Sequence, residues 1–243
     1  MITELADFDV VRIRADNGGP LTGTGTNTYV IGRDPAWVVD PGPVLAEHLD
    51  AIEAVVAARG GAGGIVATHG HADHTAAIGA LAARLGVAAG DPGPLETVPL
   101  PGHADDHVVF VWNRVCCAGD CVLGEGSVFV AGDMAAYLDG LRGLRERDLG
   151  LICPGHGEPI LDPRAKLTEY LDHRLDRERR LKEALAQGVR GEDALLDAVW
   201  DDAPRFLRPA AALTMYSHLR KLRDEGDLPG DVDTPPQPDI PDI

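Results

Sequence analysis

The chain has 243 residues, of which 44% are hydrophobic, so it is long enough for one large domain, or for one domain with a small appendage, around a sizeable core. A formal net charge of −17 repels polyanions at long range and argues against a protein that coats nucleic acid. The sequence has neither a signal-peptide pattern nor a run of the roughly 18 apolar residues that a membrane span needs, so we expect a cytoplasmic protein without a membrane partner.

The first 90 residues are expected to alternate between short strands and helices. Strands are predicted at 9–14, 28–32, 36–40 and 64–67. Helices are predicted over 43–59 and 75–85, because apolar residues in the first of them repeat at a helical spacing along one face. The Gly/Thr-rich stretch DNGGPLTGTGTN (16–27) lacks the spacing of phosphate-binding loops, so an ordinary turn between strands explains it equally well.

The second half of the chain begins with strands and ends with helices. DHVVFVWNRVCCAGD (106–120) predicts two strands joined by a tight turn near Asn113–Arg114, SVFVAG (127–132) predicts a strand before a helix, and GLICPGHG (150–157) predicts a last strand. Later helices are predicted over 163–187, 191–200 and 208–225, and the Pro- and Asp-rich tail is expected to be disordered. The expected units are therefore 1–162, 163–226 and 227–243.

A histidine cluster follows the strand predicted at 64–67. VATHGHADHTAA (66–77) places three histidines and one aspartate within six positions. In extended backbone His69 and His71 point the same way, whereas Asp73 and His74 lie where a helix begins and face another side. Imidazole and carboxylate ligands without a thiolate suit Zn²⁺ and tolerate Mn²⁺ or Fe²⁺. The stretch therefore predicts ligands for two neighbouring metal ions.

Three other predicted strand ends carry residues that would complete such a site. His103 follows a glycine in PGHADDH, Asp120 in CCAGDC and His156 in CPGHG. The predicted set is His69, His71 and His103 for one ion, and Asp73, His74 and His156 for the other, with Asp120 bridging them. Asp133 also follows a glycine, but a helical pattern comes directly after it, so it is interpreted as a helix N-cap.

In chain order, Asp40, THGHADH, PGH, GD and PGHG resemble the signature of the metallo-β-lactamase fold superfamily over about residues 10–160. A closer likeness continues to the helical end, through GTNTYVIG and HRLDRERRLKEAL, and is to the endoribonuclease β-lactamase-like protein 2 group and its bacterial relatives. The resemblance implies an α+β fold, an αββα sandwich, with a small C-terminal winged-helix-like domain.

The resemblance also implies what these residues do. The predicted ligands would hold two zinc ions, Asp73 and Asp120 would belong to the catalytic group, and Asp40 would orient ligands through hydrogen bonds. A metal-bridging hydroxide would attack an anionic substrate, which the resemblance suggests is a small molecule or a phosphodiester such as single-stranded RNA. A homodimer is compatible with the sequence.

Two other functions stay open. One is hydrolysis of a thioester or ester, as in proteins similar to glyoxalase II. The other is a non-catalytic, metal-bearing module that binds nucleic acid or a partner protein. The short interval between His74 and His103 bears on the substrate more than on the metal ions.

Several other polar residues are interpreted as structural. His107 is expected to pack in the core, and the charged stretch Arg174–Lys182 is expected to form a solvated helix face. Surface positions are predicted for His48, His173 and His218. The four cysteines, Cys116, Cys117, Cys121 and Cys153, are expected to be reduced core residues.

Overall fold

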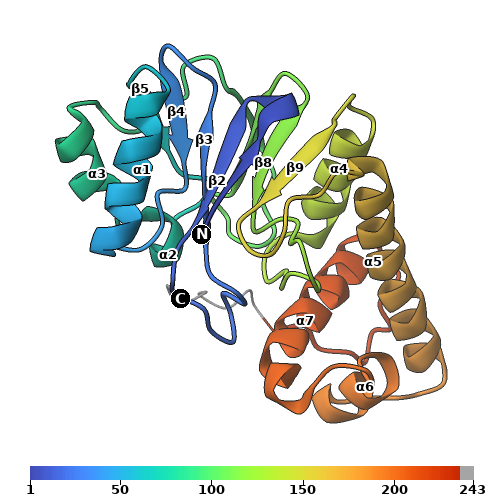
Figure 1. The fold of residues 1–243 in the computed structure, drawn as a ribbon. Helices are drawn as coiled ribbons and strands as arrows, with labels where there is room; N and C mark the ends of the chain where they lie inside the picture. Colours follow the sequence, from blue (N-terminus) through green and yellow to red (C-terminus); the bar gives the residue numbers. More distant parts are fainter. Residues whose placement is uncertain (236–243) are drawn as a thin grey trace.

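The computed structural model describes residues 1–235 of the chain. Figure 1 shows two β-sheets side by side, with α1 and α3 on one outer side, α4 on the other, and α5–α7 gathered at one end. One sheet has the strand order β1-β2-β3-β4-β5 and the other has the order β6-β7-β8-β9. This is the α+β sandwich that the resemblance implies, with apolar clusters between the sheets and under the helices on each side.

The first sheet contains the strand that leads into the histidine cluster. Its strands are β1 (Ile2–Leu5), β2 (Val10–Arg14), β3 (Asn27–Ile31), β4 (Ala36–Val39) and β5 (Ala62–Val66). All neighbours pair antiparallel except β4 and β5, which are parallel because helix α1 (Ala46–Ala58) crosses between them. Helix α3 (Ile78–Leu85) lies beside α1, and the short helix α2 (Ala72–Thr75) holds part of the cluster.

The second sheet is built in a similar way. Its strands are β6 (Glu96–Pro99), β7 (Val108–Trp112), β8 (Val115–Gly119) and β9 (Leu151–Pro154). Strands β8 and β9 are parallel, and helix α4 (Met134–Arg145) connects them. The turn between β7 and β8 falls at the predicted Asn113–Arg114, where Asn113 has a φ of 52°. Strands β1 and β6 were not predicted, because these edge strands contain only exposed and half-buried residues.

The prediction of a strand at 127–132 is wrong. This stretch, called here the 127–132 segment, is not part of either sheet. Its backbone groups bond instead to side chains of the C-terminal helices: the Val130 amide donates to Thr214 Oγ1 at 3.2 Å, and the Val130 carbonyl accepts from Ser217 Oγ at 2.8 Å. The apolar residues of this segment are buried, as in a strand, but its backbone hydrogen bonds go to helix side chains rather than to a neighbouring strand.

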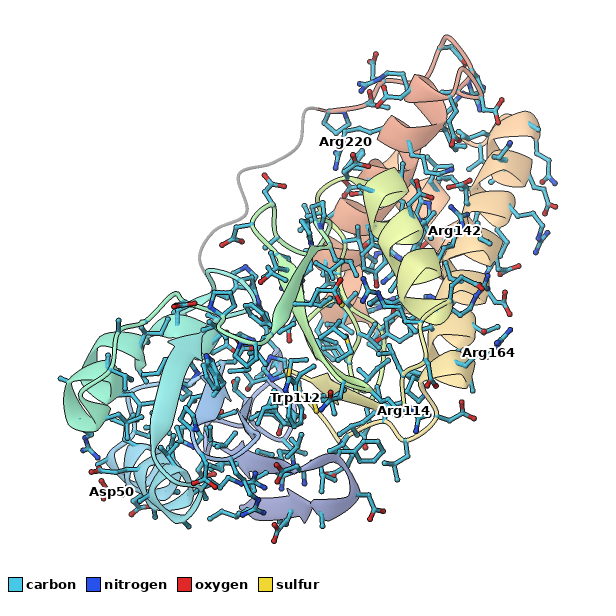
Figure 2. All side chains as sticks on the ribbon, turned by 90° about the horizontal axis from the view of Figure 1, so that it is seen from above. Asp50, Trp112, Arg114, Arg142, Arg164 and Arg220 are labelled. Carbon is cyan, nitrogen blue, oxygen red and sulfur yellow. The ribbon has the colours of Figure 1, made fainter. Side chains whose placement is uncertain are left out.

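The C-terminal part consists of helices α5 (Pro163–Ala186), α6 (Glu192–Val199) and α7 (Arg208–Asp224), with a 3₁₀ turn at Arg205–Leu207. Helix α5 begins at a proline, and the Asp162 carboxylate accepts a hydrogen bond from the Ala165 amide at 3.0 Å. The three helices share an apolar cluster of their own, and α7 also lies beside α4 (Figure 2). Within residues 1–235 no strand follows β9, so the wing of a winged-helix domain is not formed there.

Two histidines predicted on the surface are buried. His48 on α1 hydrogen-bonds through Nε2 to Thr28 Oγ1 at 2.8 Å, and His218 on α7 lies with Nδ1 3.1 Å from a Glu178 carboxylate oxygen. His173 is half-buried. A helical position alone does not reveal which face of the helix is covered, and in both buried cases the covering residue comes from a distant element.

The charged stretch of α5 is also less exposed than predicted. Arg174 and Arg177 are buried, whereas Arg179 pairs with its helix neighbours in solvent. Arg174 donates to Ser127 Oγ at 2.9 Å, and Arg177 forms an ion pair with Asp202 at 2.6 Å. One side of this helix face is therefore an internal contact surface.

Disorder was predicted for the whole tail, and this is wrong for its first residues. Leu228 and Val232 pack on the cluster of the C-terminal helices, and Asp227 pairs with Lys182 at 2.6 Å. The rest of the predicted tail, 236–243, lies outside the described residues. All four cysteines are free and buried, as expected. Within residues 1–235, no helix combines the length and the apolar character that crossing a bilayer requires.

Candidate metal centre

The predicted ligands meet where strands of both sheets end. Strand β5 ends at Val66 and runs into the histidine cluster, while β8 leads directly into Asp120 and β9 into His156. His103 lies in the loop between β6 and β7. The structure brings all the predicted ligands together at this end of the sandwich, and their side chains form overlapping groups with close donor atoms.

The first group consists of three histidine rings. His71 Nδ1 lies 2.9 Å from His69 Nε2 and 3.1 Å from His103 Nε2. All three side chains are buried. Burial lowers the pKa of His69 and of His103, so these two rings are neutral and each offers a lone pair. Neutral imidazole is the form that binds a metal ion.

The second group combines two histidines with a carboxylate. Asp73 Oδ2 lies 3.3 Å from His156 Nε2 and 3.5 Å from His74 Nε2. Burial opposes the charge on His156, but hydrogen bonds to Asp120 and Asp73 outweigh it and raise the pKa of His156 to about 9, so a metal ion that binds this ring would displace its proton. Burial likewise opposes ionisation of Asp73, yet His156 and His74 lower its pKa, so the carboxylate is charged at neutral pH.

Asp120 lies between the two groups. Its Oδ2 is 3.3 Å from His156 Nε2 and 3.8 Å from His103 Nε2, and its Oδ1 is 3.6 Å from His74 Nε2. Although burial favours the neutral acid, His74 and His156 lower the pKa of Asp120 well below its ordinary value. A single ionised carboxylate therefore reaches donor atoms of both groups.

Two observations fit a metal centre: the chemistry of the donor atoms, and buried polar atoms that lack a hydrogen-bond partner. Imidazole and carboxylate donors suit Zn²⁺. Within residues 1–235, the buried atoms His74 Nε2 and Asp120 Oδ1 have no hydrogen-bond partner, which is costly unless another group binds them. Gly155 leaves the space open, since a Cβ there would lie 2.2 Å from Asp120 Oδ1 and 2.6 Å from His74 Cε1.

Asp40 supports the histidines from behind. Its Oδ1 accepts from the Thr68 amide at 2.7 Å, and its Oδ2 accepts from Thr68 Oγ1 at 2.9 Å. Asp40 Oδ2 also lies 3.1 Å from His74 Nδ1, and Thr68 Oγ1 lies 3.0 Å from His69 Nδ1. These contacts act on the ring nitrogens that face away from the centre, and so they fix the orientation of both rings.

Other contacts of this kind were not predicted from the sequence. His103 Nδ1 donates to the Phe129 carbonyl at 3.2 Å, and Thr26 Oγ1 donates to Asp73 Oδ2 at 2.9 Å. Thr68 could have been suspected because it directly precedes His69. Phe129 contributes a backbone carbonyl, which leaves no trace in the side-chain pattern.

His107 contacts the centre without joining either group. Its ring stacks on His69 with centroids 4.9 Å apart, and its Nε2 accepts a hydrogen bond from the Asp120 amide at 3.2 Å. Burial lowers the pKa of His107 to about 3, which keeps the ring neutral and able to accept. Its position agrees with the expected packing role.

A small pocket of about 110 Å³ opens onto the centre. Its lining combines the candidate ligands His71, Asp73, His103, Asp120 and His156 with the apolar residues Leu21, Leu123, Val128 and Phe129 and the hydroxyl residues Thr22 and Ser127. Of the described residues that line it, none is a lysine or an arginine. The pocket is smaller than a site for a drug-sized ligand, so it suits the reacting end of a substrate.

Replacing Asp40 with asparagine is expected to weaken metal binding by about 10-fold, the lower end of the usual effect of a partner behind the ligands. Asparagine tolerates the left-handed backbone of this position, where φ is 53°, so the fold should persist. The measurement is Zn²⁺ affinity by competition with a chromophoric chelator. Wild-type affinity in this variant would show that Asp40 does not orient the ligands.

Two facing sheets, with histidines and aspartates gathered at the strand ends, define the class of metallo-β-lactamase-fold proteins. A family model described as "Metallo-beta-lactamase superfamily" matches residues 21–90. A "Beta-lactamase-like protein 2 homolog" of Caenorhabditis elegans is 32% identical over 262 residues, which cover 93% of this chain and 87% of that protein. The chain belongs to the metallo-β-lactamase superfamily and is a relative of its β-lactamase-like protein 2 homologues.

Two further likenesses bear on function and on fold. An "Atrochrysone carboxyl ACP thioesterase" of Aspergillus chevalieri is 32% identical over 206 residues, covering 73% of this chain and 66% of that enzyme. A solved β-lactamase domain protein from Burkholderia ambifaria matches with a TM-score of 0.76 and 15% identity, over 93% of this chain and 88% of that one. At this identity the structural likeness concerns the fold alone.

Proposed function

We propose that this chain is a hydrolase that binds two metal ions, zinc or, with the same donor set, manganese or iron. The observation that carries the proposal is the position of Asp120, whose carboxylate oxygens reach His103 of the first group and both His74 and His156 of the second. When bound, the ions would supply positive charge and a water molecule acidic enough to act as a nucleophile.

The protein's own residues would orient and confine the reaction. The ionised carboxylates of Asp73 and Asp120 hold their charge inside the site despite burial. Asp40 and Thr68 fix two of the histidine rings, while Val128 and Phe129 contribute to the apolar part of the pocket lining. A substrate group that enters this small pocket is shielded from bulk water on its apolar side.

The substrate class that the pocket favours is a thioester or ester. Its apolar wall suits an acyl group, and it offers no lysine or arginine, among the described lining residues, to hold a phosphate chain. The relative named a thioesterase supports this choice. The second candidate is a phosphodiester such as single-stranded RNA, which the whole-chain resemblance to the endoribonuclease group favours.

The experiment is a direct comparison of the two substrate classes. Purified protein reconstituted with Zn²⁺ is given a panel of acyl thioesters and, separately, end-labelled single-stranded RNA, each beside the Asp120→Asn variant. We expect thioester turnover that the variant lacks. RNA cleavage that depends on Asp120 would favour the second candidate, and zinc binding without turnover of either class would favour a binding module.

A further inference from the structure

The 127–132 segment lies between the metal centre and the C-terminal helices. On the side that faces the metal centre, it forms two hydrogen bonds with the loop that carries His103. The Phe129 carbonyl accepts a hydrogen bond from His103 Nδ1 at 3.2 Å, and the Gly132 amide donates to the Gly102 carbonyl at 2.9 Å. The segment therefore contacts both a predicted ligand and the residue directly before it.

On the opposite side, helix α7 supplies the bonds that a neighbouring strand would supply. Thr214 Oγ1 accepts from the Val130 amide at 3.2 Å. Ser217 Oγ lies 2.8 Å from the Val130 carbonyl and 3.0 Å from the Gly132 carbonyl, and its single hydroxyl proton is shared between these two acceptors. Thr214 and Ser217 are only 2% and 1% exposed, so water does not compete for these bonds.

Two arginines extend the same set of contacts. Arg220 on α7, labelled in Figure 2, donates to the Ala131 carbonyl and to Ser217 Oγ, at 2.6 and 3.0 Å. Arg174 on α5 donates to Ser127 Oγ at 2.9 Å and to the Val128 carbonyl. The backbone of the segment is thus held by side chains from two helices along most of its length.

The consequence follows from the cost of unpaired buried backbone groups. A buried amide or carbonyl that loses its partner costs about 1–3 kcal/mol, so the chain shifts to find another one. Val130 directly follows Phe129, whose carbonyl holds the His103 ring. A shift at Val130 therefore moves the acceptor that sets the orientation of His103.

We propose that Thr214 and Ser217 are positioning residues for the metal centre. They fix the 127–132 segment, so that the Phe129 carbonyl keeps His103 Nε2 directed at the ring nitrogens of His69 and His71. The affinity of this three-histidine group for its ion then depends on helix α7, which lies outside the two sheets. The inference rests on the proposed function, because it requires that the three-histidine group bind a metal ion.

The test compares metal binding in full-length variants. Thr214→Val and Ser217→Ala remove one hydroxyl each, and Thr214→Ser retains it. Tyr216→Phe is the matched control, since it removes a hydroxyl of the same helix that, among the described residues, hydrogen-bonds to Glu192, at 2.8 Å. Zn²⁺ affinity is measured by chelator competition, and the geometry of the centre is followed by the visible absorption of the Co²⁺-loaded protein.

We expect Thr214→Val and Ser217→Ala to bind one of two Zn²⁺ ions about 10-fold more weakly and to alter the Co²⁺ spectrum. Thr214→Ser and Tyr216→Phe should match the wild type in both measurements. Wild-type affinity and spectrum in folded Thr214→Val and Ser217→Ala would overturn the inference alone. A wild-type protein that binds no Zn²⁺ would overturn the proposed function together with it. Where either variant fails to fold, the other one decides.

Discussion

The Asp120→Asn variant is expected to lose more than about 100-fold in kcat/KM for the hydrolysed substrate, because even partners behind metal ligands commonly cost 10–100-fold. An asparagine keeps the size of the side chain but has no charge, and its amide NH₂ presents protons where Asp120 presents an oxygen to the histidines. The same variant should retain less than the wild-type content of zinc. Turnover and metal content by emission spectrometry are the two measurements.

Asp133 provides the matched control, since it is also an aspartate after a glycine. Its Oδ1 accepts a hydrogen bond from the Ala136 amide at 3.0 Å and caps helix α4. Asparagine is an equally good N-cap, so Asp133→Asn should keep both activity and metal content. Equal losses of activity and zinc content in the two variants, or full activity in Asp120→Asn, would contradict the bridging role proposed for Asp120.

The Gly155→Ala variant is expected to lose metal binding while the chain still folds. The added methyl group would lie 2.2 Å from Asp120 Oδ1 and 2.6 Å from His74 Cε1, so both side chains must move. Overpacking of this kind costs about 1–3 kcal/mol in unfolding free energy. Denaturant unfolding and zinc titration measure the two effects separately.

Gly143 on α4 is the comparison position. It is an exposed helical residue, and a Cβ built there would meet no atom of the described residues within 4 Å beyond its chain neighbours and its own helix backbone. Alanine should therefore stabilise the protein by about 0.4–1 kcal/mol and leave zinc binding unchanged. A Gly155→Ala protein that binds zinc like the wild type would mean that the donor atoms tolerate displacement.

The candidate ligands could be found in the sequence because each one follows a predicted strand end or lies in a short motif beside one. A strand such as β5 is apolar, and the polar residues that follow it stand out in the local pattern. The two-sheet sandwich was implied by the family resemblance that these motifs carry, not by the strand pattern itself. The edge strands β1 and β6 could not be predicted, since they contain only exposed and half-buried residues.

What could not be predicted depends on distant partners. The 127–132 segment has the apolar, β-branched composition of a strand, but its partners Thr214 and Ser217 lie 84 to 87 residues further along the chain. The burial of His218 depends likewise on Glu178, from another helix. A local sequence pattern can indicate that a residue is buried, but it does not identify the distant residues that bury it.

The two sheets share one connectivity. In β3–β4–α1–β5 and again in β7–β8–α4–β9, an antiparallel pair is followed by a crossover helix and a parallel strand. An aspartate follows the second strand of each unit, Asp40 and Asp120, and histidine ligands follow the third.

Every candidate ligand group combines side chains that follow β5 with a side chain of the second half, either Asp120 or His156 after its strands or His103 in the loop before β7, so neither half holds a complete set. Metal binding is therefore linked to the closure of one half of the molecule on the other. A metal ion at 100 times its dissociation constant would add about 2.7 kcal/mol to the free energy of unfolding. A chelator should accordingly weaken the contact between the two halves first. Each half should keep its own apolar layer, which is covered by a helix.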